Sequence, residues 1–491
     1  MIASVLIIYN KIMATFDKQS VRDEAARIKS EFDQLSLDKK YDAQTTMLFK
    51  SMLMLINLLI AIFLEKTTKK NNKNSSIPSS KNGKDDSSLT KEGSKGKGKQ
   101  ETHTAAYNTR TIDTVEVIKV KHCDICGNDL TQAACEHIER RTKIDIIFEK
   151  TVEHVDVEVK HCQDCDALVK GKFPTDMPGP LQYGNGLKAY IINLLIAQMI
   201  SLNRVQKLVK SIIGEIIAES TLLKFVLRLY VALEPWEAAS IEAILMAKAM
   251  NVDETSLRVD MQNQWIHVYS ANDITLKFLH SKRGTEAIED INIIPRYSGT
   301  IIHDFWSSYL TYTHCDHGMC GGHLVRELQH VIDSNEYKWA SNMKKLLVAT
   351  CKKVSKRKRK KLSEREHANL QENFRNIITR GEKELPPIPA KPNGKRGKIA
   401  KSDAHNLLER FKEHETAVLR FAIDPYVPFT NNRAERDLRM AKVKQKVSGC
   451  FRKELYAKAY CRISSYLQTM ANKGYNPLVA IQMALTRKID D

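Results

Sequence analysis

The sequence has little of what marks secreted or membrane proteins. Its ten cysteines are too few, in 491 residues, for the disulfide framework of a secreted scaffold. The first residues do not combine a basic stretch, an apolar stretch and a small-residue cleavage site, so we expect no signal peptide. The most apolar run, Ser51–Leu64, is 14 residues long, shorter than the roughly 20 that span a bilayer. We therefore expect a protein of a reducing compartment that does not cross a membrane.

Acidic residues are also in deficit. The chain has 77 Lys and Arg residues against 58 Asp and Glu residues, which gives a net charge of +19. Such an excess favours a polyanionic partner, because cationic side chains release counterions from a phosphate backbone. Charge alone fits a solvated basic surface equally well, so the motifs must decide between the two.

The N-terminal part of the chain is predicted to be a helical region followed by a linker. Residues 18–65 have a helical pattern, and four apolar residues follow the 3-4-3 spacing of a coiled-coil seam: Met52, Leu55, Leu59 and Ile62. The next segment, Lys66–Gln100, is rich in Lys, Asn, Ser and Gly and cannot bury enough apolar area to fold. It is either a solvated tether or a segment that lies along DNA.

Four of the cysteines form two Cys-x-x-Cys pairs: Cys123, Cys126, Cys162 and Cys165. Each pair can present two thiolates to one tetrahedral zinc ion, and four thiolates close the site, so we expect a structural zinc. The strand-like segments Val115–Val120 and Val152–Val159 precede the two pairs and indicate a small ribbon-like module. Two unconnected cysteine pairs are the alternative, with His122, Cys135 and His161 as other nearby ligands.

The region after the cysteine pairs is predicted to be helical. Leu202–Ile213, a turn at Gly214-Glu215 and a second helix at Ser220–Leu229 resemble a helix-turn-helix. Ser220 or Thr221 is the expected cap of the second helix.

Three acidic residues lie in separate predicted elements. Asp253 lies in the strand Asn251–Val259, Asp304 lies in the strand Gly299–Phe305, and Glu435 lies in a helix at 431–447. Two short strands and a helix separate the first two acids. An RNase H-like sheet has this order, with two adjacent strands and a late helix each supplying one carboxylate. Carboxylate oxygens suit Mg²⁺, and two such ions act on a phosphodiester.

Each acid has an alternative role. Glu254 or Asp260 could take the place of Asp253, and Glu435 could form an ion pair with an arginine on the helix surface. Asp304 is the strongest candidate, because it is the only acid in an apolar run and a buried carboxylate is costly unless it is paired or metal-bound.

The helix of Glu435 also carries a predicted DNA-binding stripe. Five basic residues follow one another at steps of three or four, which places them along one side of a helix where they can contact phosphates: Arg433, Arg436, Arg439, Lys442 and Lys446. A solvated basic face is the alternative.

Together these segments resemble the IS66 family of insertion-sequence transposases. The paired Cys-x-x-Cys module resembles the family's zinc-binding domain. The remaining matching blocks are Lys73–Ser80, Val252–Thr255, Asp304 with its aromatic neighbours, Cys320–Leu328 and Asn431–Arg439. One departure lies at the second acid, where the family often has a small residue and then an aromatic one, whereas this chain has Phe305 and Trp306. Residues 1–40 match nothing in the family.

The resemblance implies a DDE transposase with two Mg²⁺ or Mn²⁺ ions held by Asp253, Asp304 and Glu435. It implies cleavage at terminal inverted repeats, transfer of the cut strand to target DNA, a homo-oligomer, accessory proteins of the same element, and a place in the bacterial cytoplasm, on the nucleoid when DNA is bound. A nuclease without strand transfer and an inactive, zinc-dependent DNA-binding protein are the alternatives.

The predicted fold class is α/β, and no internal repeat is present. We expect an N-terminal helical region (1–65), a basic linker (66–109), a zinc-binding domain (110–180), a helical region like a helix-turn-helix (181–245), an RNase H-like catalytic domain (246–447) with a helical insertion at about 307–425, and a C-terminal helical region (448–491).

Overall fold

The structure is a computed structural model of the chain, and it describes residues 18–37, 43–68, 70–71, 73–75, 115–144, 148–388 and 401–486. Most of the predicted linker at 66–109 and of the family-like block Lys73–Ser80 therefore lies outside the described residues, as do residues 1–17.

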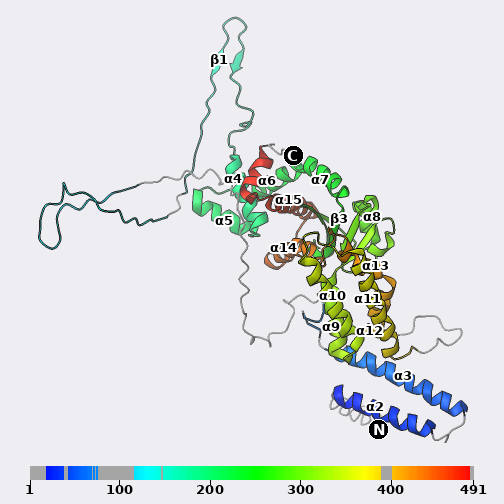
Figure 1. Ribbon diagram of the computed structural model, residues 1–491. Helices are drawn as coiled ribbons and strands as arrows, with labels where there is room; N and C mark the ends of the chain where they lie inside the picture. Colours follow the sequence, from blue (N-terminus) through cyan, green and yellow to red (C-terminus); the bar gives the residue numbers. More distant parts are fainter. Residues whose placement is uncertain are drawn as a thin grey trace, which may run out of the picture.

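A five-stranded sheet lies at the centre of the molecule (Figure 1). Its strands run in the order β5-β4-β3-β6-β7. β3, β4 and β5 are antiparallel neighbours, whereas β6 lies parallel to β3 and β7 parallel to β6. The bounds are β3 (Ala249–Val259), β4 (Gln262–Ala271), β5 (Ile274–His280), β6 (Thr300–His303) and β7 (Asp316–Met319). The predicted α/β class is thus confirmed.

Local sequence explains the sheet well except at its last strand. The turn between β3 and β4 places Asp260 and Met261 at φ 47° and 56°, as the right-handed twist of a tight hairpin requires. β7 was not predicted, because its sequence Asp-His-Gly-Met has no apolar alternation. It exists as a strand through its pairing with β6.

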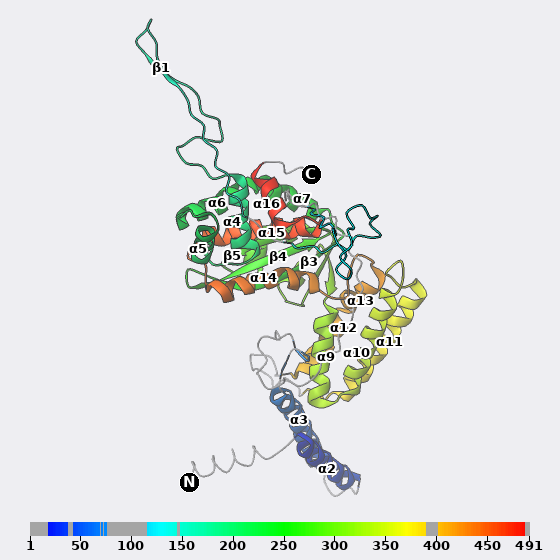
Figure 2. The same ribbon diagram turned by 90° about the vertical axis from the view of Figure 1, so that its left-hand side faces the viewer.

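Helices cover both faces of the sheet (Figure 2). One face packs against α14 (Asn432–Ser448) and the other against α7 (Glu234–Leu245) and α8 (Thr285–Ile291). α15 (Glu454–Asn472) lies along the edge strand β5, whose backbone N–H groups bond to Ser465 and Thr469. Successive residues of β4 point to opposite faces. Val268 is buried in the hydrophobic core on the α14 side, and Tyr269 is buried in the core on the α7 and α8 side. This period of two makes the sheet the shared wall of two hydrophobic cores.

A helical insertion separates β7 from α14 and begins at Gly321. It consists of α9 (Gly321–Asn335), α10 (Lys338–Ser355), α11 (Glu364–Glu384), α12 (Asp403–Glu413) and α13 (Glu415–Ile423). These helices have a core of their own that includes the fully buried Trp339, Phe374 and Phe411. Figures 1 and 2 show them as a bundle beside the sheet.

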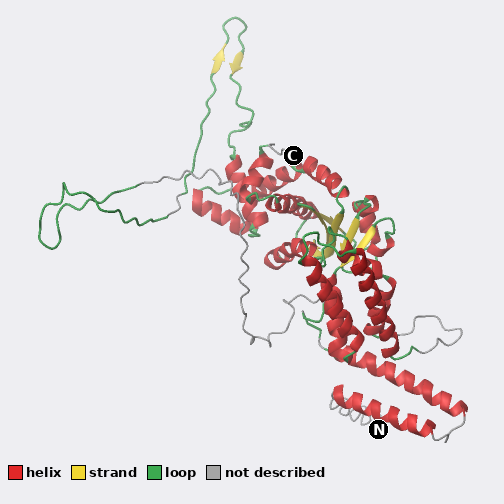
Figure 3. Ribbon diagram, viewed as in Figure 1, coloured by secondary structure: helices red, strands yellow, loops and turns green. Residues whose placement is uncertain are grey.

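The region before the sheet combines extended loops with a helical cluster (Figure 3). The strands predicted at Val115–Val120 and Val152–Val159 are wrong. In the described part of this region, β1 (Val159–His161) pairs with β2 (Leu168–Lys170), and His122 forms an isolated bridge with Asp129. The helices follow as α4 (Asn185–Ile192), the π-helix η2 (Asn193–Ala197), α5 (Leu202–Ile213) and α6 (Glu219–Ala232), with α16 (Pro477–Leu485) from the C-terminal part packed among them.

The two helices of the helix-turn-helix-like pair lie where the sequence predicted them, but the predicted cap of the second helix is wrong. Gly214, with φ 76°, ends α5 in the left-handed conformation that glycine adopts readily. α6 begins after Ala218 without a side-chain cap, so the prediction of Ser220 or Thr221 was wrong.

The N-terminal helices are α2 (Lys18–Leu37) and α3 (Ala43–Thr67). The span Gln44–Thr67 is, by length and composition, long and apolar enough to cross a membrane, which corrects the length estimated from the 14-residue run. That criterion is weak for a single helix. Three residues of the predicted coiled-coil seam are strongly exposed on α3: Met52, Leu55 and Leu59.

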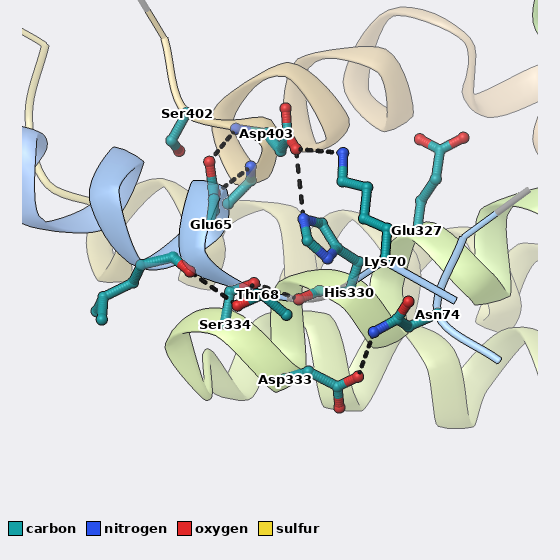
Figure 4. A network of polar contacts seen from close by, with 12 residues as sticks. Glu65, Thr68, Lys70, Asn74, Glu327, His330, Asp333, Ser334, Ser402 and Asp403 are labelled. Atoms are coloured by element: carbon teal, nitrogen blue, oxygen red, sulfur yellow. Dashed lines mark hydrogen bonds and ion pairs between the residues drawn. The ribbon is translucent and has the colours of Figure 1, made fainter. Parts of the chain in front are cut away.

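The C-terminal end of α3 is fixed to the insertion by polar contacts (Figure 4). The buried Glu65 carboxylate accepts backbone N–H groups of Asp403 and Ala404 at the start of α12. Asp403 in turn pairs with Lys70 at 3.2 Å and with His330 of α9 at 3.4 Å. Glu65 therefore caps α12, where a negative charge is favoured by the helix dipole.

We expect Glu65→Ala to release α3 from the insertion, because two N–H groups of α12 lose a charged acceptor. Hydrogen exchange of the described amides of α3 and of the first turn of α12 should rise, and the free energy of unfolding should fall by about 1–3 kcal/mol. Glu31→Ala, at an exposed position of α2, is the matched control. Unchanged exchange in α3 and α12 would refute the capping role.

A second prediction concerns His267 of β4, which is 1% exposed and whose pKa burial lowers to about 4. Below pH 6.5, the ordinary histidine pKa, His267 is protonated in the unfolded chain. In the folded chain it stays neutral until the pH falls to about 4. Stability should therefore decrease as pH falls through this window, with His267 contributing up to about 1.4 kcal/mol per pH unit. Chemical denaturation of His267→Gln should show a shallower decrease than His137→Gln, an exposed control. Equal slopes would contradict this assignment.

Candidate active site

Two predicted acids lie on neighbouring strands, Asp253 within β3 and Asp304 just after β6. β3 and β6 run parallel with Asn251 opposite Ile302. Continuing this register by two residues places Asp253 beside Asp304, on the same face and about 4.8 Å apart between strands. Asp304 follows directly after the last residue of β6.

The third predicted acid, Glu435, joins them from α14, which packs across β3. Burial raises the pKa of Asp253 well above its ordinary value, and the negative charges of Glu254, Asp304 and Glu435 also raise it. Asp304 and Glu435 thus lie near enough for their charges to act on Asp253, although the carboxylate oxygens of the three acids do not all lie within 4.8 Å of one another. Mutual repulsion of this kind is typical of sites that bind cations or perform acid–base chemistry.

One buried amide positions Glu435 against the sheet. Asn431 is fully buried just before α14. Its side chain donates to the carbonyl oxygen of Val252 at 2.8 Å and accepts from the amide of Asn251 at 2.8 Å. Its backbone N–H points at the sulfur of Cys320 at 3.1 Å, where α9 begins. Asn431 thus joins β3, α9 and α14 within two residues of Asp253.

The start of α9 approaches the chain before α14 very closely. The N–H of Gly321 donates to the carbonyl of Phe429 at 2.7 Å. A Cβ atom at this position would lie 2.3 Å from the Phe429 ring, so only glycine fits. This contact keeps the first turn of the insertion at the acidic site.

Glu435 and Asp437 have different roles, although both lie on α14. Asp437 is buried and accepts hydrogen bonds from Ser270 and Thr275, each at 2.8 Å, so it fastens the helix to β4 and β5. One oxygen of each carboxylate is buried without a hydrogen-bond partner, but that of Asp437 lies 3.8 Å from Arg436 Nε and its other oxygen is bonded to the sheet, whereas that of Glu435 faces the other acids. An unsatisfied buried carboxylate oxygen calls for a cation.

The alternative acids of the first strand have other surroundings. Glu254 is buried, where it accepts from Arg283 at 2.8 Å and from the hydroxyl of Tyr309 at 2.7 Å. Asp260 lies in the exposed hairpin turn. The structure therefore favours Asp253 as the acid of this strand.

The loop after Asp304 is held by two neutral histidines. His317 Nε2 donates to the carbonyl of Tyr312 at 3.0 Å, so its Nδ1 is the acceptor for His303 Nε2 at 3.1 Å. The remaining nitrogen of His303 accepts the N–H of Phe305 at 3.2 Å. Burial lowers the pKa of His303 to about 3, which keeps this ring neutral.

Phe305 itself has φ 82°, a conformation that L side chains rarely adopt. A small residue, which the family often has at this position, suits such a backbone better than the phenylalanine of this chain does. Here the ring contacts the guanidinium of Arg410 and the ring of His414 from the insertion.

The predicted DNA-binding residues divide into two groups. Arg436, Arg439 and Lys446 are exposed. Arg433 donates to the carbonyl of Ile274 at 3.0 Å, and Lys442 donates to the hydroxyl of Ser256 at 2.9 Å, so both brace α14 against the sheet.

Two residues near the acids were not predicted at this site. His323 Nδ1 lies 3.7 Å, and Arg326 Nη2 4.0 Å, from the same oxygen of Glu435. Burial lowers the pKa of His323, the charge of Arg326 lowers it further, and the charges of Glu435 and Asp304 oppose both effects. The Cys-x-x-His-x-x-Arg spacing was visible in the sequence. Its place beside the acids was not, because it depends on β7, which pairs with β6 and leads directly into α9.

The four cysteines of the predicted zinc module do not meet in the part of the chain that the structure describes. Each pair forms a turn of its own in an extended loop (Figures 1 and 3). Backbone N–H groups within each pair lower the pKa of Cys123 and of Cys162. Each turn is therefore formed so as to favour a thiolate, and the shared zinc stays a prediction.

A mixed α/β fold with clustered carboxylates beside a cationic helix is typical of enzymes that process DNA. The family model of the IS66 family of transposases matches residues 180–459, which include the whole sheet, the insertion and α14. This is more than half of the 491 residues, and the chain belongs to the IS66 transposase family. A transposase role, DNA as the partner and the use of divalent metal follow from that membership. A comparison with curated proteins found no match.

The backbone of Phe305 gives a prediction that is independent of activity. Phe305→Gly and Phe305→Ala both remove the ring, but only alanine keeps a Cβ at positive φ. We expect the glycine variant to be more stable than the alanine variant by about 1 kcal/mol, the reverse of their usual order. Thermal unfolding of the two purified variants measures this difference. An alanine variant as stable as the glycine variant would show that this loop is not strained.

Proposed function

We propose that this chain is a DDE transposase of an insertion sequence, with an RNase H-like catalytic core. It binds terminal inverted repeats, cuts the DNA there and transfers the cut strand to target DNA. The convergence of Asp253, Asp304 and Glu435 from two adjacent strands and a late helix carries this proposal. The strand order, with three antiparallel strands followed by two parallel ones, supports the RNase H-like core.

The three acids fit the divalent cations that such chemistry uses. Their charges repel one another, one Glu435 oxygen is buried without a partner, and carboxylate oxygens are hard ligands. Asp253, Asp304 and Glu435 would hold two Mg²⁺ or Mn²⁺ ions. When bound, such ions activate the attacking oxygen and stabilise the leaving oxygen of a phosphodiester.

The chain's own groups position the DNA for two successive displacements. Arg439, Lys442 and Lys446 lie four, seven and eleven residues after Glu435, on its face of α14, where Arg439 and Lys446 are exposed to phosphates. In the first displacement, water breaks the phosphodiester at the element's end and leaves a 3′-hydroxyl. In the second, that hydroxyl attacks a target phosphodiester, and the target's own 3′-oxygen leaves. Arg433 and Arg436 complete the proposed DNA-binding set.

The other predicted regions extend this proposal. Cys123, Cys126, Cys162 and Cys165 would share one structural zinc ion once the two loops meet. This module and the helices of 181–245 would bind the terminal repeats. We further propose a homo-oligomer formed through the exposed apolar residues of α3, cooperation with accessory proteins of the element, and action in the bacterial cytoplasm on the nucleoid.

The experiment uses DNA from the ends of the element that encodes the chain, labelled at the predicted cut strand. We expect Mg²⁺-dependent cleavage by the unchanged protein, and a loss of about 100-fold or more in Asp304→Asn and Glu435→Gln. Asp260→Asn removes an acid from an exposed turn and is the matched control. Equal cleavage by all four proteins would remove these acids from the mechanism.

Pre-cut ends mixed with target DNA then separate transposition from simple cleavage. Joined products support the transposase. Cleavage without joining would identify a nuclease, and metal-independent binding without cleavage would identify an inactive DNA-binding protein.

A further inference from the structure

A group of ligand atoms with softer chemistry lies beside the carboxylates. The sulfur of Cys320, a ring nitrogen of His323 and a carboxylate oxygen of Glu435 all lie within 4.8 Å of one another. No other group of three or more such residues meets this criterion in the part of the chain that the structure describes. Cys320 and His323 come from the start of α9, and Glu435 from the first turn of α14.

These atoms face one another without satisfying one another. His323 Nδ1 and Glu435 Oε1 are both buried without a hydrogen-bond partner, and the 3.7 Å between them is too long for a hydrogen bond. Leaving such groups unpaired costs about 1–3 kcal/mol each. A cation between them would satisfy both.

The sulfur of Cys320 is also held in a fixed position. Cys320 is 2% exposed and accepts the N–H of Asn431 at 3.1 Å. Asn431 precedes α14 by one residue, so the contact that positions Glu435 also positions the sulfur. The starts of α9 and α14, which are joined by the backbone N–H of Asn431, thus present all three ligand atoms.

The donor set selects the type of cation. Thiolate, imidazole and carboxylate together are typical ligands of zinc, whereas Mg²⁺ prefers oxygen alone. With bonds of about 2.0–2.3 Å, the ligand atoms of a tetrahedral zinc lie roughly 3.3–3.6 Å apart. Side-chain rotations that move the ligand atoms by about 1 Å bring the three residues to that geometry. The fourth position stays open, since three residues supply the ligands.

Neighbouring charges act in both directions on such a cation. The guanidinium of Arg326 lies 4.0 Å from Glu435 and opposes it, although its Nε donates to the carbonyl of Gly322. The negative charges of Asp304 and Glu327 both act on His323 and favour a cation there.

We propose that Cys320, His323 and Glu435 form a second metal site, selective for a zinc-class cation, whose occupation withdraws Glu435 from the catalytic acids. Zinc would then inhibit DNA cleavage by competing for a shared ligand. Inhibition rests on the proposed transposase function, whereas binding of the cation does not.

Binding is tested on the full chain with Co²⁺, a spectroscopic substitute for zinc, by following the thiolate-to-cobalt charge-transfer absorption. The unchanged protein should bind one equivalent more than Cys320→Ser and than His323→Gln. The Cys-x-x-Cys pairs contribute equally to all of these proteins. Asp260→Asn, which removes an acid from the exposed hairpin turn and keeps all three ligands, should bind as the unchanged protein does. The same stoichiometry in the unchanged protein and both ligand variants would overturn the site.

Inhibition is tested by adding zinc to the Mg²⁺-dependent cleavage reaction, with each protein normalised to its own zinc-free rate. The zinc concentration for half-inhibition should rise at least about tenfold in Cys320→Ser and in His323→Gln. Unchanged half-inhibition in both would overturn the competition. If the unchanged protein cuts no DNA, the proposed function fails, and the cobalt stoichiometry alone decides the metal site. Should Cys320→Ser fold poorly by thermal unfolding, His323→Gln gives the decisive comparison.

Discussion

The buried amide of Asn431 is the contact on which the acidic site depends. It binds the backbone of Val252 and the side chain of Asn251, and the backbone N–H of the same residue donates to the sulfur of Cys320. It helps to fix the register of the helix that carries Glu435 against the strand that carries Asp253. Asp437 adds a second attachment through two hydroxyl groups of β4 and β5. A buried polar group with all its partners in place specifies one arrangement, because every alternative leaves donors and acceptors unpaired.

The insertion participates in the site rather than merely interrupting the fold. α9 begins at the acids, with His323 and Arg326 near Glu435. It ends beside α3, where Ser334 binds Thr68 and Asp333 binds Asn74 in the chain after that helix (Figure 4). One rigid helix therefore connects the docking point of α3 with the acidic centre. Phe305, in the loop after Asp304, also packs against the insertion, through Arg410. The bundle thus contacts Glu435 and the loop after Asp304.

Sequence reasoning predicted the strands with Asp253 and Asp304 and the helix with Glu435 because each has strong local patterning. It missed β7, whose strand character comes from pairing with β6. It saw the Cys320, His323 and Arg326 spacing but could not place it beside Glu435, since that proximity depends on β7 and on the close contact of Gly321 with Phe429. It also could not tell that Arg433 and Lys442 brace the helix, because their partners are backbone and hydroxyl groups of distant strands. Strands expected before the cysteine pairs failed because exposed segments gain little from alternation.

The central claim is that three carboxylates from two strands and one helix form a single divalent-cation site. Anomalous diffraction at the manganese edge, from crystals of the full chain soaked in Mn²⁺, tests it most directly. The account predicts anomalous density bounded by Asp253, Asp304 and Glu435. Well-ordered carboxylates with no density between them, at Mn²⁺ concentrations that saturate the protein in solution, would contradict it.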